Sequence, residues 1–539
     1  MMRPPSRRQA LGFPEPVSGP VPPLHPAWVV LPAFAAGAVV WAATAAQGIS
    51  TSPDSAAYVS AARSLLADGS LVRFDGVPLV EQPPLYPIVL AAWSAAFGID
   101  PLAAARGLQI FAAGLLAIVM TALCARYASR DVTLLAATAI ASAIGAPFLQ
   151  VSAMAWTETI FVTMVAATLY CGLALLREPS SRRWLILLGF LAGASAVTRY
   201  AGVFVMAWAV LVTLVACRHS PVLAVGRAAG VAVLALIPIG GWALRNVAVG
   251  VAPLGPREPA DETLSRATEN VMNALAGWVM PDRADLPTGV AAAVVTACFV
   301  VAWRLRRDTA THSPVAMTKE QWLMLIVLPA GYLIFMVALS LRAAFDPLSN
   351  RLLVPAFPAL WLVLMRWAAV AVPTVSSRAL SAPAGVFLAA ILGWITTAVV
   401  FDVLRMLMTD RRDGRGFSSA AWKSSALIEQ VKGMPKHCAL TSNNPEALYL
   451  LTGFASTSAP ARMPYRSSRQ LNEISQWPPG QVTCLVGFSN VRRGYLHDLS
   501  ELQARATAVE LARANDGLLL GVPAHRFAHA VPGAPTPTP

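Results

Sequence analysis

The residues Thr51–Pro87 have the sequence TSPDSAAYVSAARSLLADGSLVRFDGVPLVEQPPLYP and follow the first hydrophobic segment of the chain. Ser52 followed by Pro53 is typical of a helix start, with serine as the N-cap and proline in the first turn. Asp54 therefore lies in the first turn, where the helix dipole favours an ionised carboxylate. Tyr58 lies one turn further along the same face. In isolation this pattern favours a helix-start acid without a catalytic role, and it is the membrane character of the following residues that makes Asp54 a candidate functional acid.

The remainder of this stretch predicts a second helix. Asp68-Gly69 is a stop signal for the first helix, and the residues up to Glu81 are rich in turn formers. Pro83-Pro84 then begins an apolar helix over Leu85–Phe97. This helix is too short to cross a bilayer easily, so we expect both helices to lie along the membrane interface, within a first outer loop over 49–104.

The composition indicates a polytopic α-helical membrane protein. The chain has 539 residues, of which 56% are hydrophobic and 13% are charged. Apolar runs of spanning length recur, and eleven spans are predicted at 28–46, 105–125, 131–150, 157–176, 183–198, 200–217, 222–244, 288–304, 321–341, 351–371 and 383–403. The net charge of +13 comes largely from arginines divided among short loops, without the aromatic-basic patch of a nucleic-acid site.

The loop charges predict the orientation. The loops on one side are short and rich in arginine, whereas those on the other side, including 245–287, hold most of the acids. By the positive-inside rule, the disordered tail 1–25 is cytoplasmic, and the first outer loop is extracytoplasmic. We expect a multi-pass protein of the bacterial inner membrane, with a transmembrane domain over 26–405.

The polar C-terminal region, 410–530, predicts a small extracytoplasmic α/β domain, followed by a disordered tail over 531–539. The predicted strands are 438–444, 483–488 and 518–524, and the predicted helices are 420–431, 445–451 and 504–514. The six cysteines show neither metal-ligand spacing nor a disulfide framework. Cys124, Cys171, Cys217 and Cys298 fall in apolar stretches, where we expect core or lipid-facing thiols.

Charged residues at the outer ends of the predicted spans are candidates for function, because charge near a membrane is costly. Glu158 lies at one such end, together with four arginines: Arg106, Arg199, Arg245 and Arg351. Any single arginine is better explained by snorkelling to the interface or by simple anchoring. Their convergence on one face instead favours a cavity that binds an anion.

Five segments carry a resemblance to a known family, in the order PDSAAYVSAARSLLADG, EQPPLYP, AWTET, TRY and NRLLVPAFP. The chain resembles the glycosyltransferase C superfamily, in particular bacterial members related to protein O-mannosyltransferases and to lipid A aminoarabinose transferases. The resemblance covers residues 25–405. It implies a polyprenyl-phosphate-linked sugar as donor, and transfer of a hexose or pentose to a lipid, glycan or protein acceptor on the outer face of the membrane.

The resemblance also implies roles for residues of this chain. Asp54 matches the catalytic carboxylate, and Glu81 and Glu158 match supporting acids. We expect the donor phosphate to be bound by arginines, namely Arg63, Arg106, Arg199, Arg245 and Arg351. We expect the substrate pocket to be lined by Tyr58, Gln82, Tyr86 and Tyr200. Ser55 stands where the family often has glutamate, and Gln82 where it often has histidine, so a divalent cation between the carboxylates is left open.

The chemistry suits these residue types. A glycosyl phosphate carries a good leaving group, so the protein must activate an acceptor hydroxyl and stabilise the departing phosphate. With Asp54 as general base, the sugar is transferred with inversion. The sequence contains no P-loop and no GxGxxG motif after a predicted strand, so it does not favour a soluble nucleotide donor. A secondary transporter and a non-catalytic membrane scaffold remain as alternatives.

Overall fold

The computed structural model describes residues 24–257, 259–278, 315–371, 397, 400–434, 438–461, 483–506 and 508–522. Six helical segments among them are long and apolar enough to cross a membrane. They comprise α4 (Pro101–Tyr127), α5 with α6 (Val132–Ile144 and Ala146–Ser152), α7 (Glu158–Arg177), α10 (Pro221–Ala248), α13 (Lys319–Ser340), and α14, η4 and α15 (Asn350–Leu353, Val354–Ala356 and Phe357–Ala371). The predicted helical membrane architecture is confirmed: the chain is a multi-pass membrane protein.

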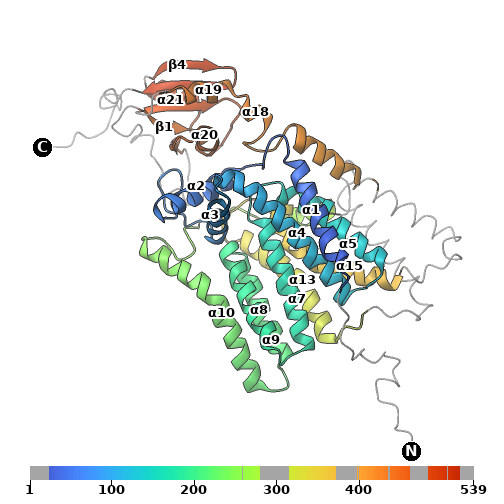
Figure 1. Cartoon of the computed structure of the whole chain (residues 1–539). Helices are drawn as coiled ribbons and strands as arrows, with labels where there is room; N and C mark the ends of the chain where they lie inside the picture. Colours follow the sequence, from blue (N-terminus) through green and yellow to red (C-terminus); the bar gives the residue numbers. More distant parts are fainter. Residues whose placement is uncertain are drawn as a thin grey trace, which may run out of the picture.

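Shorter helices complete the bundle (Figure 1), namely α1 (Ala27–Ala43), α8 (Arg182–Thr198) and α9 (Gly202–Ala216). Another short helix, α11 (Leu264–Gly277), contacts α13 and α14. Each predicted span coincides with a described helix, except 288–304 and nearly all of 383–403, which lie outside the described residues. The count of eleven spans therefore stays a prediction. The tail 531–539 and nearly all of the tail 1–25 also lie outside the described residues.

Small residues let the helices of the bundle approach closely. A Cβ atom built on Gly172 in α7 would lie 2.5 Å from the indole of Trp208 in α9. Trp208 is buried, and its indole N–H donates to the carbonyl of Met324 in α13. Without a hydrophobic driving force between helices in lipid, such close packing holds a bundle together. Gly172 thus allows three helices to share one contact.

Helix α2 (Pro53–Asp68) forms as its sequence predicts. Ser52 and Ser55 form a capping box at its start, and Gly69 ends it in the left-handed conformation at φ 76°. Helix α3 has the predicted bounds Leu85–Phe97 and also ends at a left-handed glycine, Gly98. The two helices pack against each other at the top of the bundle, beside the sheet domain (Figure 1). Their position in the membrane interface stays a prediction.

The C-terminal region contains a five-stranded mixed sheet of order β2-β1-β3-β5-β4. Its strands are β1 (Ala439–Ser442), β2 (Ser456–Ser458), β3 (Thr483–Phe488), β4 (Val509–Ala514) and β5 (Gly517–Val522). Strands β2, β1 and β3 run parallel, and β5 pairs antiparallel with both β3 and β4. The helices of the region are α18 (Ala420–Lys423), α19 (Ala426–Lys432), α20 (Pro445–Thr452) and α21 (Leu499–Ala506).

One predicted element of this domain is wrong. The helix expected over 504–514 is instead the end of α21 followed by strand β4. Alanine, leucine, glutamate and arginine favour a helix there, but the tight turn before Gly517 pairs Ala514 with Gly517 and folds β4 onto β5. Tertiary pairing therefore overrides local propensity.

The expectation of no disulfide is also wrong. Cys438 and Cys484 form a disulfide, with Cα atoms 5.8 Å apart and 46 positions apart in sequence. They meet because β1 and β3 are neighbours in the sheet, where Leu440 pairs with Cys484. Spacing along the chain could not show this pairing. Cys124, Cys171 and Cys217 are free and buried, as expected, whereas Cys298 lies outside the described residues.

Several contacts join the sheet domain to α2. The ring of Tyr449 in α20 stacks on Phe74 with centroids 5.0 Å apart, and its hydroxyl accepts a hydrogen bond from Arg63. Near the start of the C-terminal region, before its first strand, the N–H of Phe417 donates to the carbonyl of Thr51 at 3.1 Å. The helix that carries Asp54 is therefore held from both the bundle and the sheet domain.

Candidate active site

The start of α2 is anchored to the segment that precedes α7. The indole N–H of Trp156 donates to the hydroxyl of Ser52 at 2.6 Å, and the hydroxyl of Ser55 donates to the carbonyl of Ala155 at 3.1 Å. A short parallel bridge joins Ser50 to Met154. These contacts bring Asp54 in the first turn of α2 close to the first residue of α7, which is Glu158.

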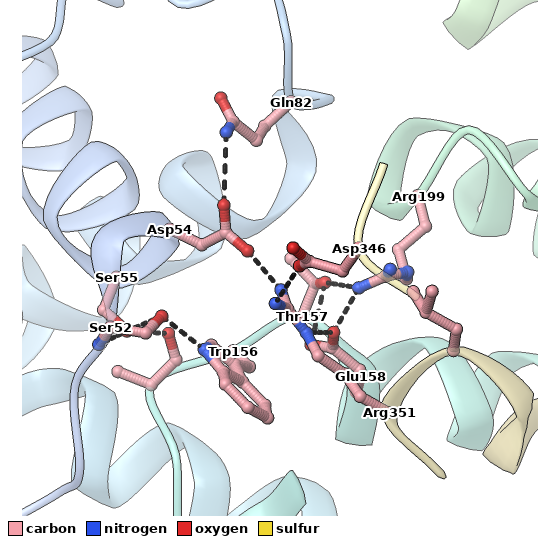
Figure 2. A network of polar contacts seen from close by, with 12 residues as sticks. Ser52, Asp54, Ser55, Gln82, Trp156, Thr157, Glu158, Arg199, Asp346 and Arg351 are labelled. Carbon is pink, nitrogen blue, oxygen red and sulfur yellow. Dashed lines mark hydrogen bonds and ion pairs between the residues drawn. The ribbon is translucent and has the colours of Figure 1, made fainter. Parts of the chain in front are cut away.

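A chain of ion pairs connects four of the predicted residues (Figure 2). The guanidinium of Arg351, at the start of α14, contacts the carboxylate of Asp54 through Nη2 and that of Glu158 through Nε. Arg199, in the turn between α8 and α9, contacts the same Glu158 oxygen. We call Asp54, Arg351, Glu158 and Arg199 the carboxylate–arginine network. It joins four segments that are distant in sequence.

The members of this network differ in exposure. The side chain of Glu158 is fully buried, and those of Arg351 and Arg199 are 16% and 18% exposed, whereas that of Asp54 is 29% exposed. A buried carboxylate is costly unless it is paired, and two guanidinium groups pair with Glu158. Glu158 is thus placed to hold the arginines, and Asp54 is the carboxylate most open to a substrate.

Three further residues support the network, although no role was predicted for them. The hydroxyl of Thr157 accepts from Arg199 at 3.1 Å and donates to Glu158 at 3.2 Å. The Arg351 guanidinium lies over the ring of Trp156, with Cζ 4.2 Å from the centroid, and 3.5 Å from the Asp346 carboxylate. The segment AWTET contains two of these residues, but only the fold shows that they face Arg351 and Arg199.

Of the predicted pocket residues, Gln82 and Tyr58 lie close to Asp54, and Tyr86 packs against Tyr58. The Gln82 side chain donates to Asp54 Oδ1 at 3.4 Å. The rings of Tyr58 and Tyr86 meet edge to face with centroids 5.1 Å apart. Burial raises the pKa of the Tyr58 hydroxyl, and the charges of Asp54 and Glu158 raise it further, so this phenol stays neutral at physiological pH.

Glu81, Arg245 and Tyr200 have partners other than the network. The Glu81 carboxylate lies 3.7 Å from Arg73 Nη1. Arg245 donates to the carbonyls of Leu71 and Leu79, and the hydroxyl of Tyr200 donates to the carbonyl of Val80 at 2.9 Å. These contacts fix the backbone directly before Gln82, so the residues are placed to shape the loop.

Arg63 and Arg106 lie on the side of α2 and α4 that faces the sheet domain and α1. Arg63 forms a bidentate ion pair with Asp100, with Nε 2.8 Å from Oδ2 and Nη2 3.0 Å from Oδ1. Burial acts to raise the pKa of Asp100, but the bonds from Arg63 and the N–H of Leu102 bring it below its usual value. Arg106 donates to the Thr44 hydroxyl at 2.9 Å and to the Trp41 carbonyl at 3.0 Å.

Over most of its length, the chain is similar in structure to ArnT from Cupriavidus metallidurans. The apo crystal structure has a TM-score of 0.61 and 14% sequence identity, covering 94% of this chain and 99% of ArnT. The structure of ArnT bound to undecaprenyl phosphate has a TM-score of 0.59 at 14% identity, with 93% and 99% covered. The chain has the glycosyltransferase C fold.

This fold is the one that the sequence resemblance predicts. Archaeal oligosaccharyltransferase AglB from Archaeoglobus fulgidus is also similar, with a TM-score of 0.46, 11% identity, and coverage of 86% of this chain and 69% of AglB. No protein-family model and no curated protein sequence matches the chain.

The arrangement around Asp54 does not fit a metal ion held between the carboxylates. The Arg351 guanidinium occupies the space between Asp54 and Glu158. Among the described residues, no group of three or more His, Cys, Asp or Glu side chains could hold a metal ion. On a glycosyltransferase C fold, this site offers a carboxylate for proton transfer and arginines for an anion.

Proposed function

We propose that this protein is a membrane glycosyltransferase, which transfers a sugar from a polyprenyl-phosphate donor to a hydroxyl group of a lipid, glycan or protein acceptor. The observation that carries the proposal is the carboxylate–arginine network at the start of α2 in a glycosyltransferase C fold. The crystal structure of ArnT bound to undecaprenyl phosphate supports a lipid-phosphate ligand for this fold.

Asp54 acts as the general base. Its carboxylate accepts the proton of the acceptor hydroxyl while the hydroxyl oxygen attacks the anomeric carbon of the donor. The bond from that carbon to the phosphate oxygen breaks, and the phosphate departs with the electron pair. Because attack comes opposite to the leaving group, the sugar is transferred with inversion.

Arg351 and Arg199 stabilise the phosphate of the donor. In the ligand-free network, the Arg351 guanidinium pairs with the Asp54 carboxylate. A lipid phosphate competes with Asp54 for the guanidinium, because guanidinium groups bind phosphate in a fork geometry. Donor binding therefore releases Asp54 to accept a proton, and base activation depends on the presence of donor.

Glu158 positions the arginines instead of reacting. It is fully buried and contacts both guanidinium groups, so it orients them while their outer nitrogens face the donor. Glu81 supports the site more indirectly, since its carboxylate pairs with Arg73 and its neighbour Gln82 contacts Asp54.

The outer face of the bacterial inner membrane is the proposed location of the site and of the sheet domain. The Cys438–Cys484 disulfide supports this orientation, because structural disulfides persist in oxidising compartments and are rare in the cytosol. The arginine-rich loops at the opposite ends of the spans support it through the positive-inside rule.

A transfer assay on the purified protein in nanodiscs tests this function. Polyprenyl-phosphate-linked hexoses and pentoses are offered with a membrane extract as acceptor, and labelled product is measured. We expect transfer from at least one lipid-linked sugar and none from the corresponding nucleotide sugars. The transporter alternative predicts flux of a solute in proteoliposomes without glycosidic product, and the scaffold alternative predicts neither; either result would contradict the proposal.

A further inference from the structure

A cavity lies between the membrane helices and the sheet domain. Its volume is about 670 Å³, within the usual range for a small-molecule site. Its walls come from three places: the chain between α1 and α2, the start of α4, and residues of the C-terminal region. Among the described residues that line it, none belongs to the carboxylate–arginine network.

The cavity is rich in positive charge. Three cations line it, Arg106, Lys423 and Lys432, together with a single carboxylate, Asp100, which is already paired with Arg63. Arg106 donates to a hydroxyl and a carbonyl, and Lys423 donates to the carbonyl and side-chain oxygen of Gln47. The acceptors of Arg106 and Lys423 are neutral, so they orient these two cations without cancelling their charge. Lys432 instead pairs with the Glu429 carboxylate at 2.6 Å.

Apolar side chains form the rest of the lining. They include Ile49 and Leu102 on the side of the bundle, and Leu450 on the side of the sheet domain. Arg106 and Leu102 lie in the first two turns of the apolar helix α4, so this wall belongs to the end of a membrane span. Close to it, Trp41 is 57% exposed and its ring lies under the Arg106 guanidinium, as is typical of residues at a membrane boundary.

We propose that this cavity binds the phosphate headgroup of an anionic membrane lipid. Arg106 and Lys423, whose partners are neutral, match a phosphate in charge, with Lys432 as a third cation beside them, and the apolar walls match the beginning of an acyl chain. The position at the end of a span lets a lipid enter from the bilayer. This site is separate from the donor site at Asp54, and its occupation joins α4 to α19 and α20 through one ligand.

Photo-crosslinking in nanodiscs tests the site. The full chain is placed in phosphatidylcholine nanodiscs that contain a trace of photoactivatable phosphatidic acid or, in a second sample, photoactivatable phosphatidylcholine. After irradiation, labelled peptides are mapped by mass spectrometry. We expect phosphatidic acid to label the segments 47–51, 100–106 and 450–451 at least about tenfold more than phosphatidylcholine, because only the phosphatidic acid headgroup carries a net negative charge.

A charge-reversal variant tests the two lysines, and two further variants serve as controls. The double variant Lys423→Glu with Lys432→Glu changes two exposed side chains and should reduce labelling by phosphatidic acid to the level of phosphatidylcholine. Arg412→Glu changes a nearby cation that is 87% exposed and outside the cavity lining, and should retain the labelling. Asp54→Asn should also retain it, since the site does not depend on the proposed transfer.

Three results would overturn the inference. Equal labelling by the two lipids would mean a non-specific lipid contact. Binding of inorganic phosphate to the protein without any labelling by phosphatidic acid would mean a free-phosphate site instead of a lipid site. Unchanged labelling in the double variant, with a melting temperature equal to that of the wild type, would show that the lysines do not recognise the headgroup.

Discussion

Replacement of Arg351 by lysine separates the geometry of the network from its charge. Arg351 uses two different nitrogens, Nη2 for Asp54 and Nε for Glu158, so one planar group bridges two carboxylates. Lysine keeps the positive charge but offers a single nitrogen and cannot reproduce the fork. Arg199 is the matched control, because it contacts the Glu158 carboxylate through one nitrogen, Nη1, and lysine can replace that contact.

The expected magnitude follows from these contacts. Arg351→Lys loses about one charge-assisted hydrogen bond, worth roughly 1.5–3 kcal/mol, which corresponds to about 10- to 150-fold. We expect that loss in kcat/KM for the donor, because Arg351 is proposed to bind the donor phosphate. Arg199→Lys retains its contact with Glu158 and should lose less than about tenfold.

The assay is the transfer reaction in nanodiscs, with the donor concentration varied and the melting temperature of each variant measured in parallel. Similar melting temperatures are expected, since both variants keep two positive charges beside the buried Glu158. Equal losses in the two variants, or a wild-type kcat/KM for Arg351→Lys, would refute the proposal that the Arg351 guanidinium binds the donor phosphate through two nitrogens.

Three further predictions concern stability and orientation. Cys484→Ser should lower the free energy of unfolding of the sheet domain by up to about 4 kcal/mol, because the bond to Cys438 closes a loop of 46 residues; thermal unfolding with and without reductant measures this. Against the opposing effect of burial, Arg63 lowers the pKa of Asp100, so their ion pair stabilises the fold above pH ~4, and this stability is lost as the pH falls below that value. The pH-dependent part of the free energy of unfolding should be less than about 1 kcal/mol, and Asp100→Asn should remove it in thermal melts across the pH range. A cysteine introduced at the exposed Ser424 should react with an impermeant maleimide added outside spheroplasts, and protection there would reverse the proposed orientation.

Local signals were sufficient for the parts of the fold that depend on neighbours in sequence. The bounds of α2 follow from Ser52-Pro53 and Gly69, and those of α3 follow from the paired prolines and Gly98. The strand β4 was missed because its residues favour a helix and only the pairing with β5 decides its conformation. The disulfide was missed for the same kind of reason, since its cysteines meet only in the sheet.

The site was predictable in its residues but not in its connections. Charge at the ends of spans singled out Glu158, Arg199 and Arg351, because such charges are costly near a membrane. The same argument selected Arg245, which instead donates to backbone carbonyls of the first loop. Whether a charged side chain meets another charge or a carbonyl depends on how the helices pack, and the sequence pattern carries no signal for that.

The turnover of Asp54→Asn tests the central claim most directly. Asparagine keeps the shape of the side chain and removes its basicity, and general-base catalysis contributes about 10²–10⁴-fold. Asp68→Asn makes the same substitution at the exposed C-terminal end of the same helix and serves as the control. We predict that Asp54→Asn folds and binds the lipid-linked donor but loses at least about a hundredfold in kcat, while Asp68→Asn turns over as the wild type. Near-normal kcat in Asp54→Asn would contradict the account.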